Sequence, residues 1–506
     1  MTEVLSTNPV TGERIGLGFD ESTSNDVTLA GLRAAGAARN LSAQSFEWRA
    51  GLLEMMASSL EDDAGSIVSC ADRETGLGDG RLSGELRRTC FQFRFFANVV
   101  RDGAFLEASI DHAHDSPMGP LPDLRRQLEP LGPVGVFGAS NFPFAFSVPG
   151  GDTASALAAG CPVIIKAHPS HPMTSKVTFD SLAHAARSHG APEASVQLIF
   201  GLTAGSALVG DLSITAIGFT GSYQAGRALF DLAQARPTPI PFYGELGSVN
   251  PLVVSPDAAE ARPAALGEGL VSSVALGSGQ FCTKPGLIFI PVGDGGDTVV
   301  RSARTAVSVI GGAPMLSEAI RNRFVSGVEA ILAVPGVSLI ARSASSPAAS
   351  GADVVIVETN AQALRGEQRS VLETECFGAV AIVVRYDGRS ELLEVLETLD
   401  PALTFTCHVE EDDPYGPSLL AIGRRKCGRV IVNGFPTGVG VSWSMHHGGP
   451  LPAATSSLHS SVGASAMRRW LRPVSYQAVP DPWLPESLQE ANPLAIPRRV
   501  DGTLLL

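Results

Sequence analysis

Cys282 is the residue of this sequence whose surroundings best suit covalent chemistry. It lies in Gly279-Gln280-Phe281-Cys282-Thr283, where glycine and small polar neighbours leave a side chain accessible. A thiol becomes a nucleophile when it is exposed and its pKa falls. Most single cysteines are inert, buried side chains. The pentapeptide by itself therefore favours an inert cysteine over a nucleophile.

A carboxylate, Glu245, lies in Phe242-Tyr243-Gly244-Glu245-Leu246-Gly247-Ser248. Apolar and glycine residues enclose it, directly before a predicted strand. Such surroundings raise the pKa of a carboxyl group and suit it to general base catalysis. A helix N-cap or an exposed loop charge is the alternative, and these residues alone favour that alternative.

An amide donor, Asn141, lies in Ser140-Asn141-Phe142-Pro143, after the first strand of a predicted sheet. The side-chain amide of an asparagine at such a position can donate a hydrogen bond to a developing oxyanion. The alternative is an ordinary Asx-turn, which is common before loops that contain proline.

Two further segments are suited to a phosphate or a ribose. Phe219 to Gly226 predicts a strand, a tight glycine turn and a helix start, and Ser222 can cap that helix or hydrogen-bond a pyrophosphate there. The segment does not match GxGxxG. Lys166 ends the strand Val163–Ile165, where it can meet a ribose or a phosphate. Lysines that end strands are more often simply solvated.

The elements that must position these residues alternate between strand and helix. Short apolar runs at 134–137, 163–165, 196–200 and 216–219 predict strands, and 174–189 and 222–234 predict helices. This alternation predicts βαβ units, with a parallel sheet covered by helices on both faces. Ligands of such sheets bind at the carboxyl ends of the strands.

The pattern restarts after residue 250. Strands are expected at 251–254, 287–290, 354–357 and 380–384, and one helix at 258–277, so a second α/β domain occupies roughly 250–435. The chain up to about residue 110 is expected to be mainly helical, as in the amphipathic run 48–60. The Pro-rich segment 111–130 ends in the alternating run Leu124–Leu128 and predicts a protruding hairpin.

Composition limits the class of protein. A length of 506 residues corresponds to about three domains at roughly 150 residues each. A formal charge of −14 without a long basic cluster argues against nucleic acid as a partner, because Arg424-Arg425-Lys426 is the densest run of cations.

Cysteine usage and hydropathy limit the location of the protein. Seven widely spaced cysteines without a CxxC pair argue against disulfides and a zinc site. The polar, acidic start of the chain does not resemble a signal peptide. No stretch approaches about 18 uninterrupted apolar residues. We therefore expect a cytoplasmic protein that holds no metal.

In their order and spacing, six motifs resemble the signature series of the aldehyde dehydrogenase superfamily. They are SNFP at 140–143, the strand-end Lys166, FTGSxxxG at 219–226, ELGSxNP at 245–251, GQxCT at 279–283 and ExFG at 375–378. The resemblance covers nearly the whole chain and implies an α/β fold. Two Rossmann-like parallel-sheet domains are expected, with a small oligomerisation element.

The resemblance also assigns the segments. Residues 1–110 and 131–249 would form the nicotinamide cofactor domain, and 250–440 the catalytic domain. Residues 111–130 and 470–506 would form the oligomerisation hairpin and the C-terminal segment. The 124–128 run and Leu504-Leu505-Leu506 read as edge strands that another subunit would cover, so a homodimer or homotetramer is expected.

Longer stretches resemble one branch of the superfamily, the bacterial α-ketoglutaric semialdehyde (2,5-dioxovalerate) dehydrogenases. These stretches are 81–85, 137–163, 446–457 and 472–488. A related branch is the NADP-preferring fatty aldehyde dehydrogenases. The resemblance implies NAD(P)-dependent oxidation of an aldehyde to an acid, with α-ketoglutaric semialdehyde as the expected substrate and a long-chain aldehyde as the alternative.

The mechanism implied by the resemblance gives each candidate a role. The thiolate of Cys282 attacks the aldehyde, and the Asn141 side chain and the Cys282 backbone N–H hold the oxyanion. Hydride leaves for the nicotinamide, and Glu245 activates the water that hydrolyses the thioester. The matching cofactor positions are Lys166, Ser170, Gly221, Ser222, Leu246, Glu375 and Phe377.

Two departures from the family pattern concern the cofactor. Pro169 stands where NAD-preferring members often carry a glutamate that grips the ribose 2′-hydroxyl. Without that carboxylate nothing there repels a 2′-phosphate, so NADP is expected to be accepted and preferred over NAD. Ala379 replaces the usual proline of ExFGP, which predicts a looser backbone after Phe377 without affecting Glu375.

The substrate side is less defined. A keto-acid substrate needs a cation or backbone N–H groups, and the candidates are Arg81, Arg88 and Arg425. Aromatic residues suit either a small keto-aldehyde or an apolar tunnel; these are Phe142, Phe144, Phe281, Phe435 and Trp443. His446 and His447 are expected to be solvated loop residues, with a substrate-side role as the alternative.

Two other classes remain open at this stage. The thioester would pass to coenzyme A in an acylating dehydrogenase, but Glu245 favours hydrolysis. A non-enzymatic member of the fold is opposed by the presence of Cys282, Glu245 and Asn141 together.

Overall fold

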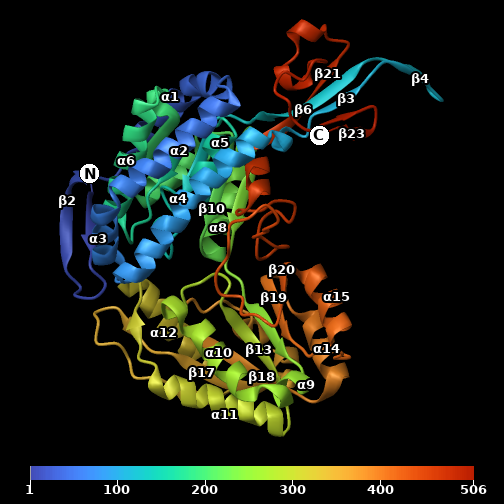
Figure 1. Cartoon of the computed structure of the whole chain (residues 1–506). Coiled ribbons are helices and arrows are strands. Elements are labelled where there is room, and N and C mark those ends of the chain that lie inside the picture. Colours follow the sequence, from blue (N-terminus) through green and yellow to red (C-terminus); the bar gives the residue numbers. More distant parts are fainter. Residues whose placement is uncertain (1, 506) are drawn as a thin grey trace.

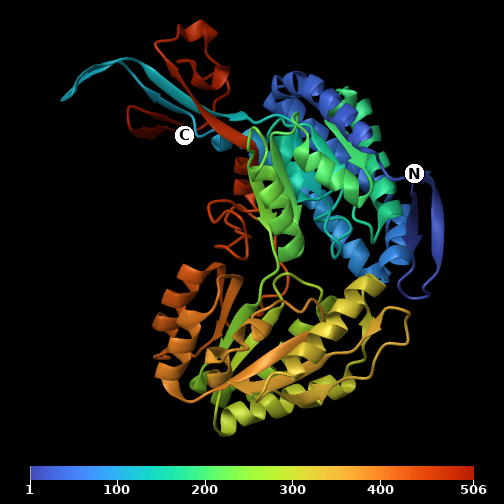
Figure 2. The same cartoon turned by 180° about the vertical axis from the view of Figure 1, so that it is seen from behind.

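The chain begins with a β-hairpin and four helices. The structure, a computed structural model, describes residues 2–505 (Figures 1 and 2). The opening elements are β1 (Glu3–Thr7), β2 (Arg14–Asp20), α1 (Ser24–Ser42), α2 (Phe46–Asp62), α3 (Ala64–Thr75) and α4 (Asp79–Asp102). The helical prediction is confirmed. The hairpin was not predicted, although Ile15, Leu17 and Phe19 alternate with polar or glycine residues.

The first large sheet is parallel throughout, in the order β11-β10-β7-β8-β9. Its strands are β7 (Val134–Phe137), β8 (Val163–Lys166), β9 (Val196–Ile199), β10 (Ala216–Thr220) and β11 (Phe242–Glu245). The helices that follow its strands are α5 (Gly151–Ala158), α6 (Pro172–Ser188), α7 (Leu202–Gly210) and α8 (Tyr223–Gln234). One face packs on α2, α4, α5 and α6, and the other on α1, α7 and α8.

The second sheet has the order β15-β17-β18-β13-β12-β19-β20, and only β15 runs antiparallel. Its strands are β12 (Asn250–Val254), β13 (Pro285–Pro291), β15 (Ser338–Arg342), β17 (Val355–Asn360), β18 (Val380–Tyr386), β19 (Ala402–His408) and β20 (Cys427–Val432). The sheet is covered by helices α10 (Pro263–Ala275), α11 (Asp294–Val309), α12 (Glu318–Leu332), α14 (Gly388–Thr398) and α15 (Gly416–Lys426). The predicted strands of both sheets are confirmed.

The helix predicted at 258–277 is wrong as a single element. The structure has α9 (Pro256–Ala261) and α10 (Pro263–Ala275), separated at Arg262, whose φ of −146° and ψ of 49° are not helical. Pro263 causes the break, because a proline lacks the N–H that a helix interior needs and disfavours helical geometry in the preceding residue.

A third sheet projects from the molecule, as Figure 1 shows. Its strands pair antiparallel, except that β3 and β22 are parallel. Its order is β21-β6-β3-β22-β23, with a short β4–β5 hairpin beyond it. The strands are β3 (Ser109–Asp111), β4 (His114–Ser116), β5 (Gly119–Leu121), β6 (Leu124–Pro130), β21 (Leu471–Gln477), β22 (Arg498–Val500) and β23 (Thr503–Leu505). We call residues 107–130 and 471–505 the arm. The predicted protruding hairpin is confirmed, and exposed Leu504 and Leu505 lie on an outer strand; Leu506 lies outside the described residues.

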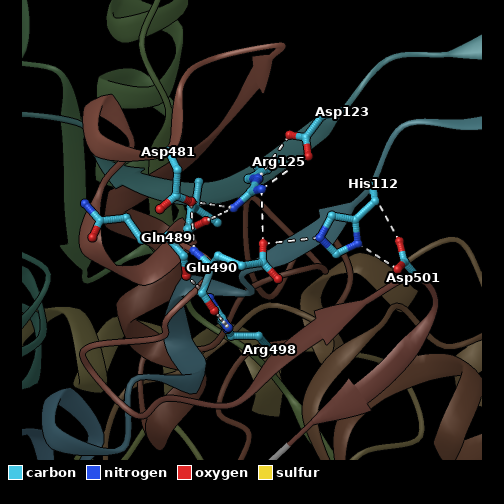
Figure 3. A network of polar contacts seen from close by, with 9 residues as sticks. His112, Asp123, Arg125, Asp481, Gln489, Glu490, Arg498 and Asp501 are labelled. Atoms are coloured by element: carbon cyan, nitrogen blue, oxygen red, sulfur yellow. Dashed lines mark hydrogen bonds and ion pairs between the residues drawn. The ribbon is translucent and has the colours of Figure 1, made fainter.

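An ion-pair network joins the two chain segments of the arm (Figure 3). The guanidinium of Arg125, on β6, lies 3.0 Å from Asp123, 3.2 Å from Asp481 and 3.2 Å from Glu490. It also donates a 2.6 Å hydrogen bond to the carbonyl of Leu488. One buried cation therefore holds a hairpin and a distant C-terminal segment together.

His112 extends this network. Its Nδ1 lies 2.7 Å from Asp501 and its Nε2 3.2 Å from Glu490. The two carboxylates raise the pKa of His112 above its ordinary value, mainly through their hydrogen bonds.

Residues 2–505 lack two kinds of feature. None of the helices there is both long and apolar enough to cross a bilayer. No group of three or more His, Cys, Asp or Glu side chains in the same residues is arranged to hold a metal ion.

Candidate active site

The predicted catalytic residues meet where the carboxyl edge of the first sheet faces the amino end of β13. Asn141 follows β7, Glu245 ends β11, and Cys282 lies in the turn before β13. The Asn141 side chain donates a 2.8 Å hydrogen bond to the carbonyl of Gln280, which joins the two sheets. The site therefore needs both parallel sheets.

Hydrogen bonds and a glycine fix the turn that carries Cys282. The Asn250 side chain donates to the carbonyls of Cys282, at 2.8 Å, and Lys284, at 3.0 Å. Gly279 has a φ of +69°, and a Cβ on it would lie 2.3 Å from backbone atoms of Gly378 and Ala379. Only glycine permits this approach, so the GQxCT and ExFG loops rest against each other. Asn250 belongs to the motif ELGSxNP, but only the structure shows that its side chain holds the Cys282 turn.

The thiol of Cys282 is protonated in the resting site. Burial raises its pKa first, and the carboxyl groups of Glu245 and Glu375 raise it further. The expected thiolate is therefore not the resting species, and attack on a substrate needs a base in contact with the thiol.

His447 provides that contact. Its Nε2 lies 3.4 Å from Sγ of Cys282 and 3.2 Å from Oε2 of Glu245. The contact with Glu245 has the distance of an ion pair without the alignment of a hydrogen bond. Burial lowers the pKa of His447 to about 3, so its imidazole is neutral.

The expectation that both loop histidines are solvated is wrong for His447, which is 1% exposed. Its backbone N–H donates to the hydroxyl of Ser460 at 2.9 Å, which holds the loop against the site. His446 is partly buried. The sequence carried no sign of this difference between neighbours, because it depends on how the 446–461 loop returns to the first sheet.

Glu245 is buried at the end of β11, with 7% exposure. The hydroxyl of Ser461 donates to its Oε1. Burial raises the pKa of Glu245 to about 8. A cavity of about 20 Å³ adjoins Glu245 and His447 and is lined by Ser461 and His459, which is room for one water molecule.

Asn141 is also buried, and it is not an Asx-turn residue, because its amide reaches Gln280 across the sheets. The guanidinium of Arg81 donates a 2.7 Å hydrogen bond to the Asn141 carbonyl. An asparagine amide has two N–H bonds, so one remains for a ligand beside Cys282.

The predicted cofactor residues line the same edge of the first sheet. Lys166 ends β8 with 6% exposure, and Ser222 caps the exposed N-terminus of α8 with a 3.4 Å hydrogen bond from Ala225. Gly221 precedes that cap. Free N–H groups at a helix start, beside a lysine, form a donor set that fits a dinucleotide pyrophosphate.

The other predicted cofactor residues lie in neighbouring loops. Glu375 approaches Gly247 so closely that a Cβ there would lie 2.2 Å from its Oε2, and burial raises the pKa of Glu375 to about 7. Leu246 packs on Gly226 of α8. Ser170 donates its N–H to His168 at 3.1 Å, and Phe377 is half-buried against the second sheet.

Two charged residues from outside the motifs lie near the strand-end lysine. Burial lowers the pKa of Lys166 to about 8, while the carboxylate of Glu21 acts in the opposite direction. Pro169 is exposed. Burial lowers the pKa of His168, and Arg323 of α12 is close enough to lower it further. The sequence shows that position 169 carries no carboxylate, but it did not indicate that Glu21 lies close to Lys166.

The three candidate arginines have different surroundings. The Arg81 guanidinium lies 5.3 Å from the ring of Phe142 and 5.1 Å from that of Phe281. Arg88 lies 5.2 Å from the ring of Phe146.

Arg425 pairs with Glu397 on the surface, so its prediction as a substrate residue is wrong. The sequence instead missed Arg429, which donates to the carbonyl of Gly438 at 2.9 Å. Burial lowers the pKa of Arg429, while the nearby Cys282 sulfur acts in the opposite direction.

Two of the predicted aromatic lining residues lie elsewhere. Phe144 is fully buried in the core. Phe435 packs on His408, 5.0 Å between rings, at the carboxyl end of β19 and so at the opposite edge of the second sheet from Cys282. A further one, Trp443, packs on Phe95 of α4.

Ala379 is buried, and its carbonyl accepts the N–H of Val355 at 2.8 Å. The backbone at this position is thus tied to β17. A hollow of about 890 Å³ between α1 and α6 contains none of the predicted site residues, so volume alone does not locate the chemistry.

Comparison with known proteins gives a consistent result. The Aldehyde dehydrogenase family matches residues 2–472. The chain is 46% identical to "Alpha-ketoglutaric semialdehyde dehydrogenase 2" of Azospirillum brasilense, over 91% of this chain and 88% of that one. It is 41% identical to "Alpha-ketoglutaric semialdehyde dehydrogenase" of Acinetobacter baylyi, over 99% and 95%. The crystal structure of PnpE in complex with nicotinamide adenine dinucleotide shares the fold, with a TM-score of 0.79, 22% identity and coverage of 94% and 93%.

Proposed function

The chain belongs to the aldehyde dehydrogenase family, and we propose that it oxidises α-ketoglutaric semialdehyde to 2-oxoglutarate with NAD or NADP. The observation that carries the chemistry is the contact of the Cys282 thiol with His447, which itself lies against Glu245. The substrate is inferred from the two relatives above.

In the first step His447 accepts the thiol proton as Sγ of Cys282 attacks the aldehyde carbon. The imidazole is neutral and 3.4 Å from the sulfur, so its Nε2 can take the proton as the S–C bond forms. Its low pKa makes it a weak base, so it releases the proton to water rather than holding it. The remaining N–H of the Asn141 amide and the Cys282 backbone N–H stabilise the oxyanion of the hemithioacetal. An oxyanion donor of this kind contributes about 3 kcal/mol to transition-state stabilisation.

A bound nicotinamide cofactor would supply the hydride acceptor, and loss of hydride from the hemithioacetal would leave a thioester on Cys282. Lys166, Ser222 and Glu375 would hold the cofactor, with Ser170, Gly221, Leu246 and Phe377 around them.

Glu245 then activates water for hydrolysis of the thioester. Its raised pKa makes it a stronger base than an ordinary carboxylate once it is ionised. The adjoining cavity with room for one water molecule favours hydrolysis over transfer to coenzyme A.

We propose that both cofactors are used and that NADP is preferred. Pro169 leaves no carboxylate in the motif, and Arg323 adds a cation nearby. Glu21 opposes a 2′-phosphate. The ratio of kcat/KM for NADP and NAD tests this proposal, and a strong preference for NAD would contradict it.

We propose a separate role for the part of the chain that builds each sheet. Residues 1–110 and 131–249 bind the cofactor, 250–440 carry the nucleophile, and the arm joins subunits into a dimer or tetramer. Exposed edge strands and apolar side chains such as Met118 and Leu504 support an interface there.

A substrate panel tests the function. The purified protein is mixed with α-ketoglutaric semialdehyde, succinic semialdehyde or a long-chain alkanal, with each cofactor, and the absorbance of the reduced cofactor is followed. We expect the highest kcat/KM for α-ketoglutaric semialdehyde. A higher value for the long-chain alkanal would assign the protein to the fatty aldehyde branch instead.

A further inference from the structure

Arg88 lies on the face of α4 that looks toward the reacting groups. Arg81, Glu85 and Arg88 follow one another at helical spacing, so they share that face. The Arg88 guanidinium stacks 5.2 Å from the ring of Phe146, whose ring in turn lies 6.3 Å from the ring of His447. One aromatic ring thus separates Arg88 from the base that contacts Cys282.

The donors of Arg88 are nearly unused. Its Nη2 makes one long hydrogen bond of 3.4 Å to the carbonyl of Val439. Its Nη1 is buried and has no hydrogen-bond partner within residues 2–505. Over the same residues no carboxylate lies within ion-pair distance of Arg88. Burying a guanidinium without a partner is costly, which indicates a site that is completed by an anionic ligand.

Each neighbouring charged group has at least one short hydrogen bond, although Arg81 Nη1, Glu85 Oε2 and Arg429 Nε are also buried without a partner within residues 2–505. Arg81 donates to Asn141 and stacks on two phenylalanine rings, and Arg429 donates to the carbonyls of Pro436 and Gly438. Glu85 accepts the backbone N–H groups of Phe144 and Ala145 through Oε1, so it serves the loop after Asn141.

We propose that Arg88 binds the carboxylate of the substrate and so selects carboxylated aldehydes over neutral ones. The proposal rests on the proposed function, because it takes the aldehyde to be oxidised at Cys282. The planar fork of a guanidinium pairs with both oxygens of a carboxylate. The substrate then spans from Arg88, past the ring of Phe146, to the thiol, with its aldehyde at the thiol and its acid group at the far end.

Three variants test the proposal. Arg88→Gln removes the charge, Arg88→Lys keeps the charge without the fork, and Arg87→Gln is the matched control, because Arg87 is the exposed neighbour on α4. The substrates are α-ketoglutaric semialdehyde and pentanal, which has no acid group. We expect R88Q to lower kcat/KM for the keto acid by about 10- to 100-fold, mostly through KM. R88K should recover part of the loss, and R87Q should match the wild type.

The rate with pentanal distinguishes binding of the substrate carboxylate by Arg88 from a structural role of Arg88. We expect R88Q to oxidise pentanal as the wild type does, which also shows that the variant is folded. An equal loss for both aldehydes would overturn the proposal and make Arg88 a structural residue.

Inhibition by glutarate gives a readout that does not depend on the identity of the substrate. This unreactive dicarboxylate should compete with pentanal in the wild type and in R87Q, and the competition should weaken by about 10-fold or more in R88Q. Undiminished inhibition of R88Q would overturn the proposal. If the wild type instead prefers pentanal to the keto acid, the proposed function fails, while loss of glutarate inhibition in R88Q would still support the anion site.

Discussion

The catalytic centre and the arm use the same residue types in opposite ways. In the arm, the carboxylates around His112 and Arg125 are paired with cations, the pKa of His112 is raised and that of Asp501 is lowered. In the centre, burial dominates: the pKa of Glu245 is raised and that of His447 is lowered. Paired ions favour their charged forms, whereas buried and poorly paired groups favour their neutral forms. The direction of the shift therefore separates a structural network from a site prepared for proton transfer.

The sharpest test of this contrast removes the nucleophile. Cys282→Ser should lower kcat by at least about 10⁴-fold, because a serine hydroxyl is a far weaker nucleophile when a histidine alone assists it. Cofactor reduction measured with excess enzyme checks this. Cys90→Ala is the control, since Cys90 lies in the core of α4, away from the site. Continued turnover of the Cys282 variant would contradict the mechanism.

Glu245→Gln should come next, with a loss of about 10²- to 10⁴-fold in steady-state turnover. The first half of the reaction does not need this base, so a burst of reduced cofactor should remain.

The pH dependence of thioester hydrolysis in the wild type also tests whether Glu245 is the base. The carboxylate form of Glu245 grows as pH rises through about 8, so thioester hydrolysis should accelerate with pH through that value. Rapid-mixing measurements of the burst and the slow phase separate the two steps. A flat profile for the slow phase would exclude Glu245 as the base.

In the arm, Arg125→Gln should affect stability rather than chemistry. The Arg125 side chain is 8% exposed and three carboxylates depend on it, so we expect a loss of about 1 to 3 kcal/mol in the free energy of unfolding. Urea unfolding and size-exclusion chromatography measure the loss and any change in assembly. Arg126→Gln is the matched control, because the Arg126 side chain is 40% exposed and its ion-pair partner, Glu107, is 3.9 Å away. Loss of activity in the folded Arg125 variant would contradict the view that the network in the arm is structural and not catalytic.

The smallest effect should be the pH response of His112. Its pKa is higher in the folded arm than the ordinary 6.5, so protonation stabilises the arm at low pH. This stabilisation is lost as pH rises through the folded value. The protection factors of the amides in β3 and β22, which remove the intrinsic rise of exchange with pH, should fall over that range in the wild type but not in His112→Gln.

Local patterns predicted much of this structure. β7, β8 and β10 were predicted because their buried residues form uninterrupted apolar runs bounded by turns. Asn141 was found because it follows such a strand, and Glu245 because apolar and glycine residues enclose it directly before the next predicted strand. A break at Pro263 was readable from the proline itself, yet a continuous hydrophobic pattern outweighed it.

Other residues depend on long-range packing. His447 and Glu21 lie in segments whose composition resembles any polar loop, and only the fold brings them to Cys282 and Lys166. Arg425 and Arg429 lie four positions apart on the chain, but one faces solvent at the end of α15 and the other lies on β20. No local signal distinguishes them.

The contact between Cys282 and His447 has a consequence for biosynthesis, because 165 residues separate the two. A ribosome makes the chain from its N-terminus, so the thiol leaves the exit tunnel long before its base. The serine that holds Glu245 comes later still, 216 residues after that carboxylate. An unfinished chain therefore carries a cysteine without its proton acceptor, and reactivity toward aldehydes arises only after residues 446–461 have left the ribosome.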